Sequence, residues 1–213
     1  MANELSSFFS SILPELVPDN LRSFGAGGQV YNSEIVGGFN VSANLENPLF
    51  TFRKGDGSVA NSNFLTNLHE AGKIGSTMEF LCTHVGVRVV KIAGAGTANT
   101  AAEVQAMKAL LASATIELGL GSDNTKIGEF SGMHFMSPID TETSDVSTVT
   151  AVSSVGGACA NGFIRLRMPI PMQRNVELRG NVKFAQTPAS ALTTTANSYG
   201  FVVILYGLKV VST

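Results

Sequence analysis

The sequence has no tryptophan, only three tyrosines and two cysteines, and few charged residues. Charged residues make up 14% of the chain, against about 25% in typical soluble domains. The scarcity of tryptophan and tyrosine disfavours a platform on which sugars or bases stack. The net charge of −2 gives no sign of a basic patch or tail, so we expect no sequence-specific contact with nucleic acid.

Positive charge is also missing at the start of the chain, where the first Lys or Arg is Arg22. A signal peptide normally begins with a basic flank, so we expect a chain made in a reducing compartment. In such a compartment Cys82 and Cys159 are expected to be free rather than bridged. The alternative of one structural disulfide stays open, because spacing alone cannot place two cysteines together.

The chain is instead rich in the patterns of β-strands. Its most apolar stretch, Ser198–Val211, reads SYGFVVILYGLKVV and carries a single charge. It is too short for a membrane-spanning helix, which needs about 20 apolar residues, and its β-branched and aromatic content predicts a strand buried on both faces. Ile164–Met168 and Val176–Phe184 alternate apolar and polar residues, which is typical of strands with one buried face. The prolines between them, Pro169 and Pro171, are expected in the connection.

Other stretches predict helices and further strands. Thr100 and Glu103 have the spacing of a capping box, and strong helix formers continue to about Ser113. Residues 3–13 also show one apolar helical face, and two interpretations stay open for it: packing on its own domain, or docking on a neighbouring subunit or an underlying layer. The further strands are expected at Ser33–Val36, Phe39–Ala43, Leu49–Arg53, Met78–Ala93, Thr115–Leu120, Lys126–Phe130 and Val146–Val155.

These elements together predict an all-β protein. We expect an antiparallel β-sandwich, a single jelly roll, with one inserted α-helix. No repeat or linker divides the chain, and 213 residues suit one β domain. The domain is expected to cover residues 33–213, preceded by a short N-terminal helical arm over residues 1–32.

One stretch has part of the pattern of a dinucleotide-binding unit. A strand is followed by a Gly-x-Gly turn at Gly94 and Gly96, a helix and a second strand, and Glu117 stands about 20 residues on, where a ribose-binding acid is expected. However, Asn99 replaces the third glycine, and no further alternation of strands and helices follows to build a parallel sheet. We therefore interpret the stretch as a helix inserted between sandwich strands and expect no cofactor.

Candidate metal ligands are scattered. Cys82 and His84 lie two residues apart on one expected strand, hence on one face, but His69 and His134 are distant in sequence. We therefore expect a buried thiol and a hydrogen-bonded histidine rather than a metal site. The acidic segment Asp140–Asp145 lacks the glycine and terminal glutamate of a calcium loop, so a solvated loop is favoured, while a calcium ion between subunits stays open. No nucleophile elbow indicates a catalytic site, and an enzyme is not expected.

The C-terminal third resembles a known family. The block RLRMPIPMQRNVELRGNVKF, followed by YGFVVILYGLKVV, resembles the end of jelly-roll capsid proteins of tailless icosahedral bacterial and archaeal viruses. In both, a proline-bearing junction precedes an amphipathic strand and a final apolar strand, and the resemblance covers about Gly162–Val211. It implies a homo-oligomeric shell subunit of a virion, made in the host cytoplasm and often placed above an internal membrane. It assigns no role to any single residue.

The low charge refines this expectation. A shell protein that packs a naked genome directly usually carries a basic arm, because neutralising phosphates releases counterions. Before the first expected strand this chain carries Glu4, Glu15 and Asp19 but only one base, Arg22. We therefore expect lipid or another protein beneath the shell. The expected partners are copies of this chain, other capsid or membrane proteins of the virion and, through residues 1–17, an internal membrane.

An alternative of a different class stays open. A small-molecule-binding protein with a cupin-like β-barrel would share the many short strands of this sequence. It would need histidines that converge inside the barrel, and the three histidines of this chain are far apart in sequence. The size of the particle that the protein forms distinguishes the two interpretations.

Overall fold

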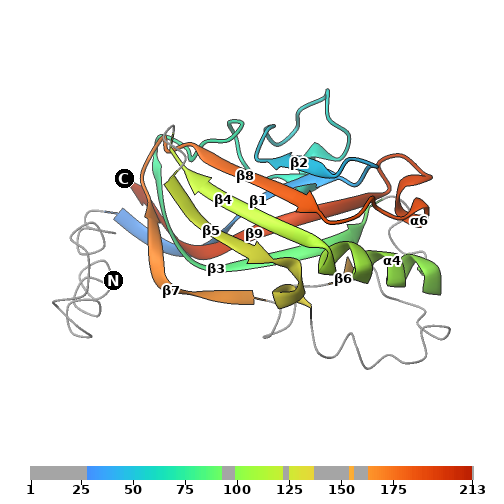
Figure 1. Ribbon diagram of the computed structural model, residues 1–213. Helices are drawn as coiled ribbons and strands as arrows, with labels where there is room; N and C mark the ends of the chain where they lie inside the picture. Colours follow the sequence, from blue (N-terminus) through green and yellow to red (C-terminus); the bar gives the residue numbers. More distant parts are fainter. Residues whose placement is uncertain (1–27, 93–98, 122–124, 137–153, 156–162, 213) are drawn as a thin grey trace.

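The computed structural model describes residues 28–92, 99–121, 125–136, 154–155 and 163–212 (Figure 1). Strands dominate this part of the chain. They are β1 (Gly28–Asn40), β2 (Glu46–Leu49), β3 (Met78–Lys91), β4 (Ala114–Leu120), β5 (Thr125–Ser131), β6 (Ser154–Val155), β7 (Phe163–Met172), β8 (Leu178–Phe184) and β9 (Tyr199–Ser212). The described helical elements are α3 (Ser62–Leu65), α4 (Ala101–Ala112), the 3-10 helix η1 (Gly132–Phe135) and α6 (Ser190–Thr193).

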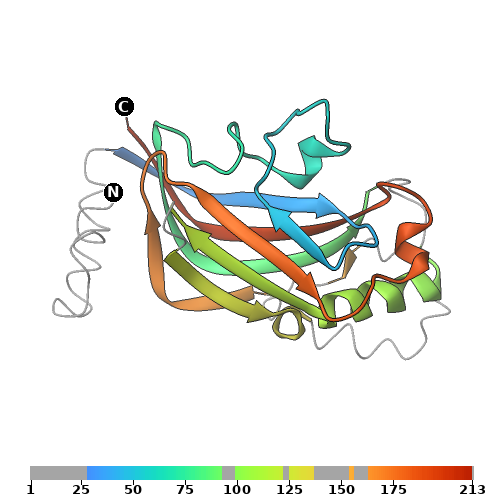
Figure 2. The same ribbon diagram turned by 45° about the horizontal axis from the view of Figure 1, so that its top comes forward.

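The strands form two sheets that pack face to face (Figures 1 and 2). In sheet A, β9 lies between β1 and β3, and both β6 and β7 pair with the other side of β3. In sheet B the order is β2-β8-β4-β5. All of these pairings are antiparallel. The expected all-β, antiparallel sandwich is therefore confirmed.

Strand β9 is the central strand of sheet A, as its apolar sequence predicts. It pairs with β1 along one side, from Gly200 to Ser212, and with β3 along the other, from Tyr199 to Val211. Its segment Phe201–Leu205 is buried on both faces. Such burial requires a cover on the side away from sheet B as well as the sandwich core on the other.

The core between the sheets is filled by large apolar side chains. Three phenylalanines from different strands meet there: the rings of Phe39 and Phe201 stack with centroids 5.4 Å apart, and Phe184 meets both edge-on at 6.2 and 5.6 Å. Aromatic pairs in these geometries contribute about 0.5–1.5 kcal/mol each beyond the area that they bury. Helix α4 closes one end of the sandwich (Figure 1), with Met107 and Leu111 fully buried.

The chain between β2 and β3 covers part of the outer face of sheet A (Figure 2). Phe52 and Leu65 of this connection pack on Val202 and Ile204 of β9. The connection is also tied to β1, because the Val36 amide donates to Asn67 Oδ1 at 2.9 Å and the Thr66 hydroxyl donates to the Val36 carbonyl at 3.0 Å. The groove described below lies on the remaining part of this outer face, toward β7.

Two expectations for the strand boundaries are wrong. Pro169 and Pro171 lie within β7 rather than in the connection after it. Proline is tolerated there because β7 is at the edge of sheet A, where a missing backbone donor does not break pairing on two sides. The strand expected at Leu49–Arg53 ends at Leu49, because Phe50 has a φ of 61° and turns the chain away from the sheet.

The helix expected from Thr100 is confirmed as α4, and both hydrogen bonds of its capping box are present. Strand β1 starts at Gly28, which pairs with Ser212, so the expected boundary between arm and domain after residue 32 falls inside this strand. The expected N-terminal helix lies outside the described residues. Of the strand expected at Val146–Val155, only the last two residues are described, as β6.

Candidate functional site

The outer face of sheet A, turned away from sheet B, carries a cavity of about 610 Å³. We call it the basic groove. It is formed by β1, β3, β7 and β9, and its lining residues are Asn32, Ser33, Thr83, His84, Arg165, Leu166, Arg167, Pro169, Tyr206, Gly207 and Leu208. The lining contains two arginines and a histidine but no aspartate or glutamate. The groove is therefore a candidate site for a negatively charged group.

A β-bulge in β3 shapes the groove. The register of β3 against both β7 and β9 shifts between Cys82 and His84. Cys82 therefore points into the core, where it is fully buried, whereas His84 lines the groove on the opposite face. The expectation that these two residues share a face is wrong, because the extra residue of a bulge reverses the alternation of the strand.

Hydrogen bonds hold the bulge and orient the histidine ring. The Thr83 hydroxyl donates to the Tyr206 carbonyl at 3.2 Å. Because this bond uses the only hydrogen of that hydroxyl, Nδ1 of His84, 2.9 Å from Thr83 Oγ1, is the donor of the second bond. With Nδ1 as the donor, Nε2 of the ring is an acceptor.

Four polar residues face one another in a row across sheet A. Glu34 of β1 pairs with Tyr206, Tyr206 pairs with His84, and His84 pairs with Arg165 of β7. Residues directly opposite in antiparallel strands place their side chains on the same face. The row therefore brings an acid, a phenol, an imidazole and a guanidinium together from four separate parts of the chain.

Gly86 leaves space for an aromatic pair beside this row. The rings of Phe163 and Tyr206 meet edge-on with centroids 4.5 Å apart. A Cβ on Gly86 would lie 2.7 Å from the Phe163 ring and 3.1 Å from Cε2 of Tyr206, closer than side-chain carbons pack. Burial raises the pKa of Tyr206. The nearby charge of Arg88 lowers this pKa and that of Glu34 raises it. The Tyr206 hydroxyl is therefore a hydrogen-bond donor at neutral pH.

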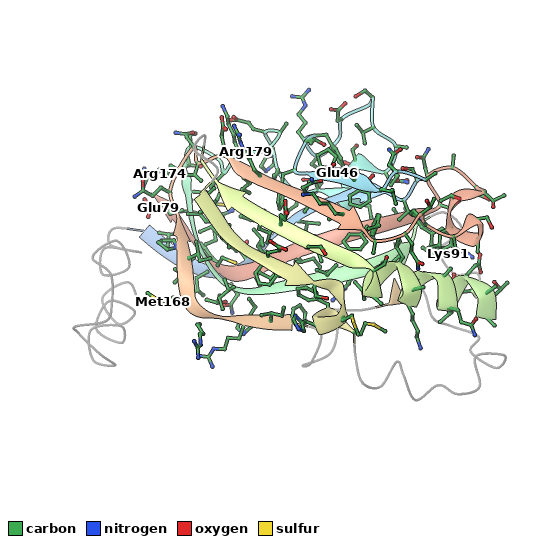
Figure 3. The ribbon with its side chains drawn as sticks, viewed as in Figure 1. Glu46, Glu79, Lys91, Met168, Arg174 and Arg179 are labelled. Atoms are coloured by element: carbon green, nitrogen blue, oxygen red, sulfur yellow. The ribbon has the colours of Figure 1, made fainter. Side chains whose placement is uncertain are left out.

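The arginines of this face have no partners among the described residues. Arg165 and Arg167 are exposed, and neither forms an ion pair or a hydrogen bond with a residue that the structure describes. Within the same limit, Nε of Arg88 is buried without a hydrogen-bond partner. Met168, which follows Arg167 in β7, is 55% exposed and lies at the bend of the strand (Figure 3). Among the described residues, this face thus combines positive charge that has no ion-pair partner with exposed apolar surface.

The outer face of sheet B is different, because its charges are paired. Lys183 Nζ lies 3.2 Å from Glu117 Oε1, and Arg179 Nη2 lies 3.0 Å from Glu177 Oε2. Asn181 Nδ2 donates to the carboxylate of Glu46. Glu46 and Arg179 lie on the side of the molecule formed by β2 and β8 (Figure 3). Exposed pairs of this kind are typical of a solvated surface and contribute little to stability.

A second cluster, at the opposite end of the sandwich, joins α4 to sheet A. Glu103 Oε1 accepts a 2.6 Å hydrogen bond from the Tyr199 hydroxyl and lies 3.3 Å from Lys91 Nζ; Lys91 is labelled at this end (Figure 3). These partners, with the Thr100 amide, lower the pKa of Glu103 to about 2, and the Tyr199 hydrogen bond is the largest cause. Because each of these groups is bonded to the Glu103 carboxylate, the cluster stabilises the start of α4.

Among the described residues of the dinucleotide pattern, Glu117 already has a partner. Glu117 lies on the outer face of sheet B, where it is bonded to Lys183. The first turn of helix α4 is part of the Glu103 cluster just described. Gly94 and Gly96 lie outside the described residues. Glu117 therefore has a partner that accounts for its charge without a ribose.

The candidate metal ligands are also separate. Cys82 is a free, buried thiol, His69 and His134 are exposed, and His84 lies in the basic groove. Cys159 and the segment Asp140–Asp145 lie outside the described residues. Among the residues that the structure does describe, no group of three or more His, Cys, Asp or Glu side chains is placed to hold a metal ion.

The sequence of β3 contains a signal for the bulge that shapes the groove. The residues of β3 that point into the core between the sheets occupy even positions at Phe80 and Cys82 and odd positions at Val85 and Val87. This change of parity, with two polar residues at the change, indicates a bulge. Tyr206, by contrast, stands in an apolar run, and nothing in that run distinguishes it from a core residue.

No protein-family model matches the chain, and a search of curated proteins finds no match. In the part of the chain that the structure describes, no helix has the length and apolar character needed to cross a membrane. The function is therefore argued from the architecture and the two outer faces.

Proposed function

We propose that this chain is a structural capsid protein. It is a single jelly roll with an N-terminal helical arm, and its copies assemble into the icosahedral shell of a tailless bacterial or archaeal virus, above an internal lipid or protein layer. The protein is not an enzyme in this proposal. Its work is to form repeated contacts with copies of itself.

The pairing of the strands is the observation that carries this proposal. Leaving aside the two-residue β6, the strands pair as nested antiparallel partners: β4 with β5, β3 with β7, β2 with β8 and β1 with β9. Partners belong alternately to sheet B and sheet A. A long hairpin of four pairs, wrapped so that its pairs fall into two sheets, is the plan of a jelly roll, which viral capsid proteins share with lectin domains and cupins.

The packing of the interior favours a structural role over ligand binding in the barrel. Side chains from both sheets meet between them, and the largest ones are fully buried: Phe80, Phe135, Phe201, Ile116, Leu118 and Met172 are among them. A barrel that holds a small molecule keeps an internal cavity for it. The basic groove instead lies on the outside of the sandwich, where another chain can reach it.

The composition gives independent support. With 14% charged residues and a mean hydropathy of +0.22, a monomer would risk exposing large apolar patches, which soluble monomers rarely do. Closed assemblies bury such surface in repeated contacts, and a standard interface buries about 1,200–2,000 Å². Arg165 and Arg167 on one outer face have no partner among the described residues, whereas Arg179 and Lys183 on the other are paired, so the subunit has two chemically distinct sides.

Analytical ultracentrifugation tests the proposal. The purified chain, at increasing concentration, is expected to form a fast-sedimenting species, and electron microscopy of that fraction is expected to show closed particles of uniform size. A 22.3 kDa monomer at every concentration would contradict the shell and favour the alternative, a pocket-bearing, cupin-like barrel. Open fibres or amorphous aggregates would also contradict it, because a capsid requires contacts that close.

A further inference from the structure

We propose that the basic groove is the docking site for the N-terminal segment, residues 1–27, of a second copy of this chain. The inference rests on the proposed function, because an assembly is what brings a second copy to the groove. It assigns the donor and the acceptor of one contact between subunits. The argument depends on three features: the charge of the groove, the charge of the segment and the place where the segment joins the fold.

The acceptor is positive and partly apolar. Arg165 and Arg167 alternate along β7, so both guanidinium groups lie on the same face of the strand. His84 and Tyr206 add a ring nitrogen and a phenol opposite Arg165. The arginines have no partner among the described residues, and no carboxylate is among the lining residues. Guanidinium groups in this state bind carboxylates well, because a charge-assisted, two-pronged hydrogen bond satisfies both partners.

The donor has the complementary composition. Residues 1–27 carry three carboxylates, Glu4, Glu15 and Asp19, and one cationic side chain, Arg22. Between these acids are the apolar residues of the expected helical face, including Phe8 and Phe9. A segment that is both acidic and apolar matches a groove that combines unpaired arginines with Leu166, Pro169 and Leu208.

The segment is attached close to the groove. It joins β1 at Gly28, and Asn32 and Ser33 of the same strand line the groove. The four steps from Gly28 to Asn32 span about 13 Å at 3.3 Å per strand residue. The segment therefore joins the fold beside the face that carries the groove, where the groove of an adjacent copy in the assembly can receive it.

This arrangement produces a contact that repeats. The donor segment and the acceptor groove are different surfaces of the same chain, so each copy can give one contact and receive another. A contact of this type is heterologous and forms closed rings when its rotation closes. It explains why Arg165 and Arg167 have no partner among the described residues, while Arg179 and Lys183 of sheet B are paired.

Charge exchange between two full-length variants tests the proposal. The acceptor variant carries Arg165→Glu and Arg167→Glu, and the donor variant carries Glu4→Lys, Glu15→Lys and Asp19→Lys. Each variant alone pairs like charges in the groove, so the concentration at which larger species form is expected to rise at least about tenfold. An equimolar mixture is expected to assemble near the wild-type concentration, because each segment then meets a groove of opposite charge. Sedimentation of the two variants and the mixture measures this.

A matched control uses the other sheet. Arg179→Glu with Lys183→Glu makes the same change of charge on the outer face of sheet B, and assembly is expected to stay within about twofold of wild type. Thermal melting checks that each variant is folded, which is expected because Arg165 and Arg167 are exposed. If the charge-reversed groove variant does not fold, the neutral variant Arg165→Gln with Arg167→Gln replaces it. Adding Glu4→Gln, Glu15→Gln and Asp19→Asn to this variant should weaken assembly no further than either set of substitutions alone, because both sets remove the same contact.

The outcomes separate this inference from the proposed function. If wild type assembles and the groove variants assemble equally well, the inference is wrong and the capsid proposal stands. A second outcome is that neither variant assembles alone, that their mixture does not assemble, and that a single chain carrying both sets of substitutions does assemble. The segment would then dock in the groove of its own copy, and the second-copy proposal would be wrong. If wild type forms no larger species, both proposals fail together.

Discussion

The Tyr199 hydroxyl donates a hydrogen bond of 2.6 Å to Oε1 of Glu103, and this bond joins the first residue of β9 to the first turn of α4. The other oxygen of the same carboxylate accepts the Thr100 amide at 2.6 Å. One ionised side chain therefore caps a helix and attaches that helix to the central strand of sheet A. Burial, together with the bond to Glu103, raises the pKa of Tyr199, so the phenol stays protonated as the donor.

We expect the stability contributed by Glu103 to depend on pH. Its pKa is lowered from 4.5 to about 2 in the folded protein, so the ionised form stabilises the fold fully above pH 4.5 and progressively less as the pH falls toward 2. Glu103→Gln should therefore cost about 1 kcal/mol at pH 7, allowing for solvent screening, and nearly nothing at pH 2. Thermal or urea unfolding of both proteins from pH 7 to 2 measures the difference. A difference that does not change with pH would contradict the role of the carboxylate.

The buried position of Ile204 gives a second prediction. Its side chain is 6% exposed and packs with Phe52 and Leu65 under the connection between β2 and β3. Ile204→Asp should prevent soluble folding, because an unpaired buried carboxylate costs several kcal/mol of the 5–15 kcal/mol, roughly, that holds a domain together. Ile204→Val is the control and should cost about 0.5–1.5 kcal/mol. A soluble Asp variant with wild-type melting would show that this face of β9 is open.

A third prediction concerns Gly207, beside the bulge. A Cβ there would lie 1.8 Å from the Leu81 carbonyl oxygen, and a backbone atom cannot move aside without distorting the pairing of β3 and β9. Gly207→Ala is expected to lower the free energy of unfolding by about 2 kcal/mol or more. At Gly75 a Cβ meets nothing within 4 Å, so Gly75→Ala should be neutral or stabilising by up to about 1 kcal/mol. Equal effects of the two substitutions in urea unfolding would be inconsistent with this close approach.

The fourth prediction concerns the reactivity of Cys82. Burial raises the pKa of its thiol to about 12, and the S–H group donates a weak hydrogen bond to the His84 carbonyl at 3.5 Å. At pH 8 only about one thiol in 10,000 would be ionised even if reagent could reach it. Iodoacetamide should therefore leave Cys82 unmodified in the folded protein and modify it in urea, as mass spectrometry of its peptide can show. Rapid modification of the native protein would mean that β3 opens easily at the bulge.

The parts of the fold that follow from sequence are those fixed by neighbouring residues. The alternation in Val176–Phe184 predicts β8, and the spacing of Thr100 and Glu103 predicts α4, because both patterns act within a few residues. The apolar run that becomes β9 is identified for the same reason. The prolines of β7 were misplaced because whether a strand tolerates proline depends on its position in the sheet, which local sequence does not contain.

The groove depends on relationships that span the whole chain. Glu34, Tyr206, His84 and Arg165 face one another because three strand pairings align them in register. Their separations in sequence are set by the topology, so no spacing rule could have grouped them. The alternation of Arg165 and Arg167 correctly predicts a polar face of β7. That these two charges have no partner among the described residues follows only from the three-dimensional arrangement.

The prolines of β7 affect what can be added to the sandwich. No described strand pairs with the far side of β7, so this is where another polypeptide could extend sheet A by strand addition. Pro169 and Pro171 are two residues apart, and the amides of alternate residues point to the same edge of a strand. Both lack that N–H, so the strand is a poor template for further growth. Extension of sheet A by a strand of another copy is therefore disfavoured at this edge, which leaves contacts between copies to side chains.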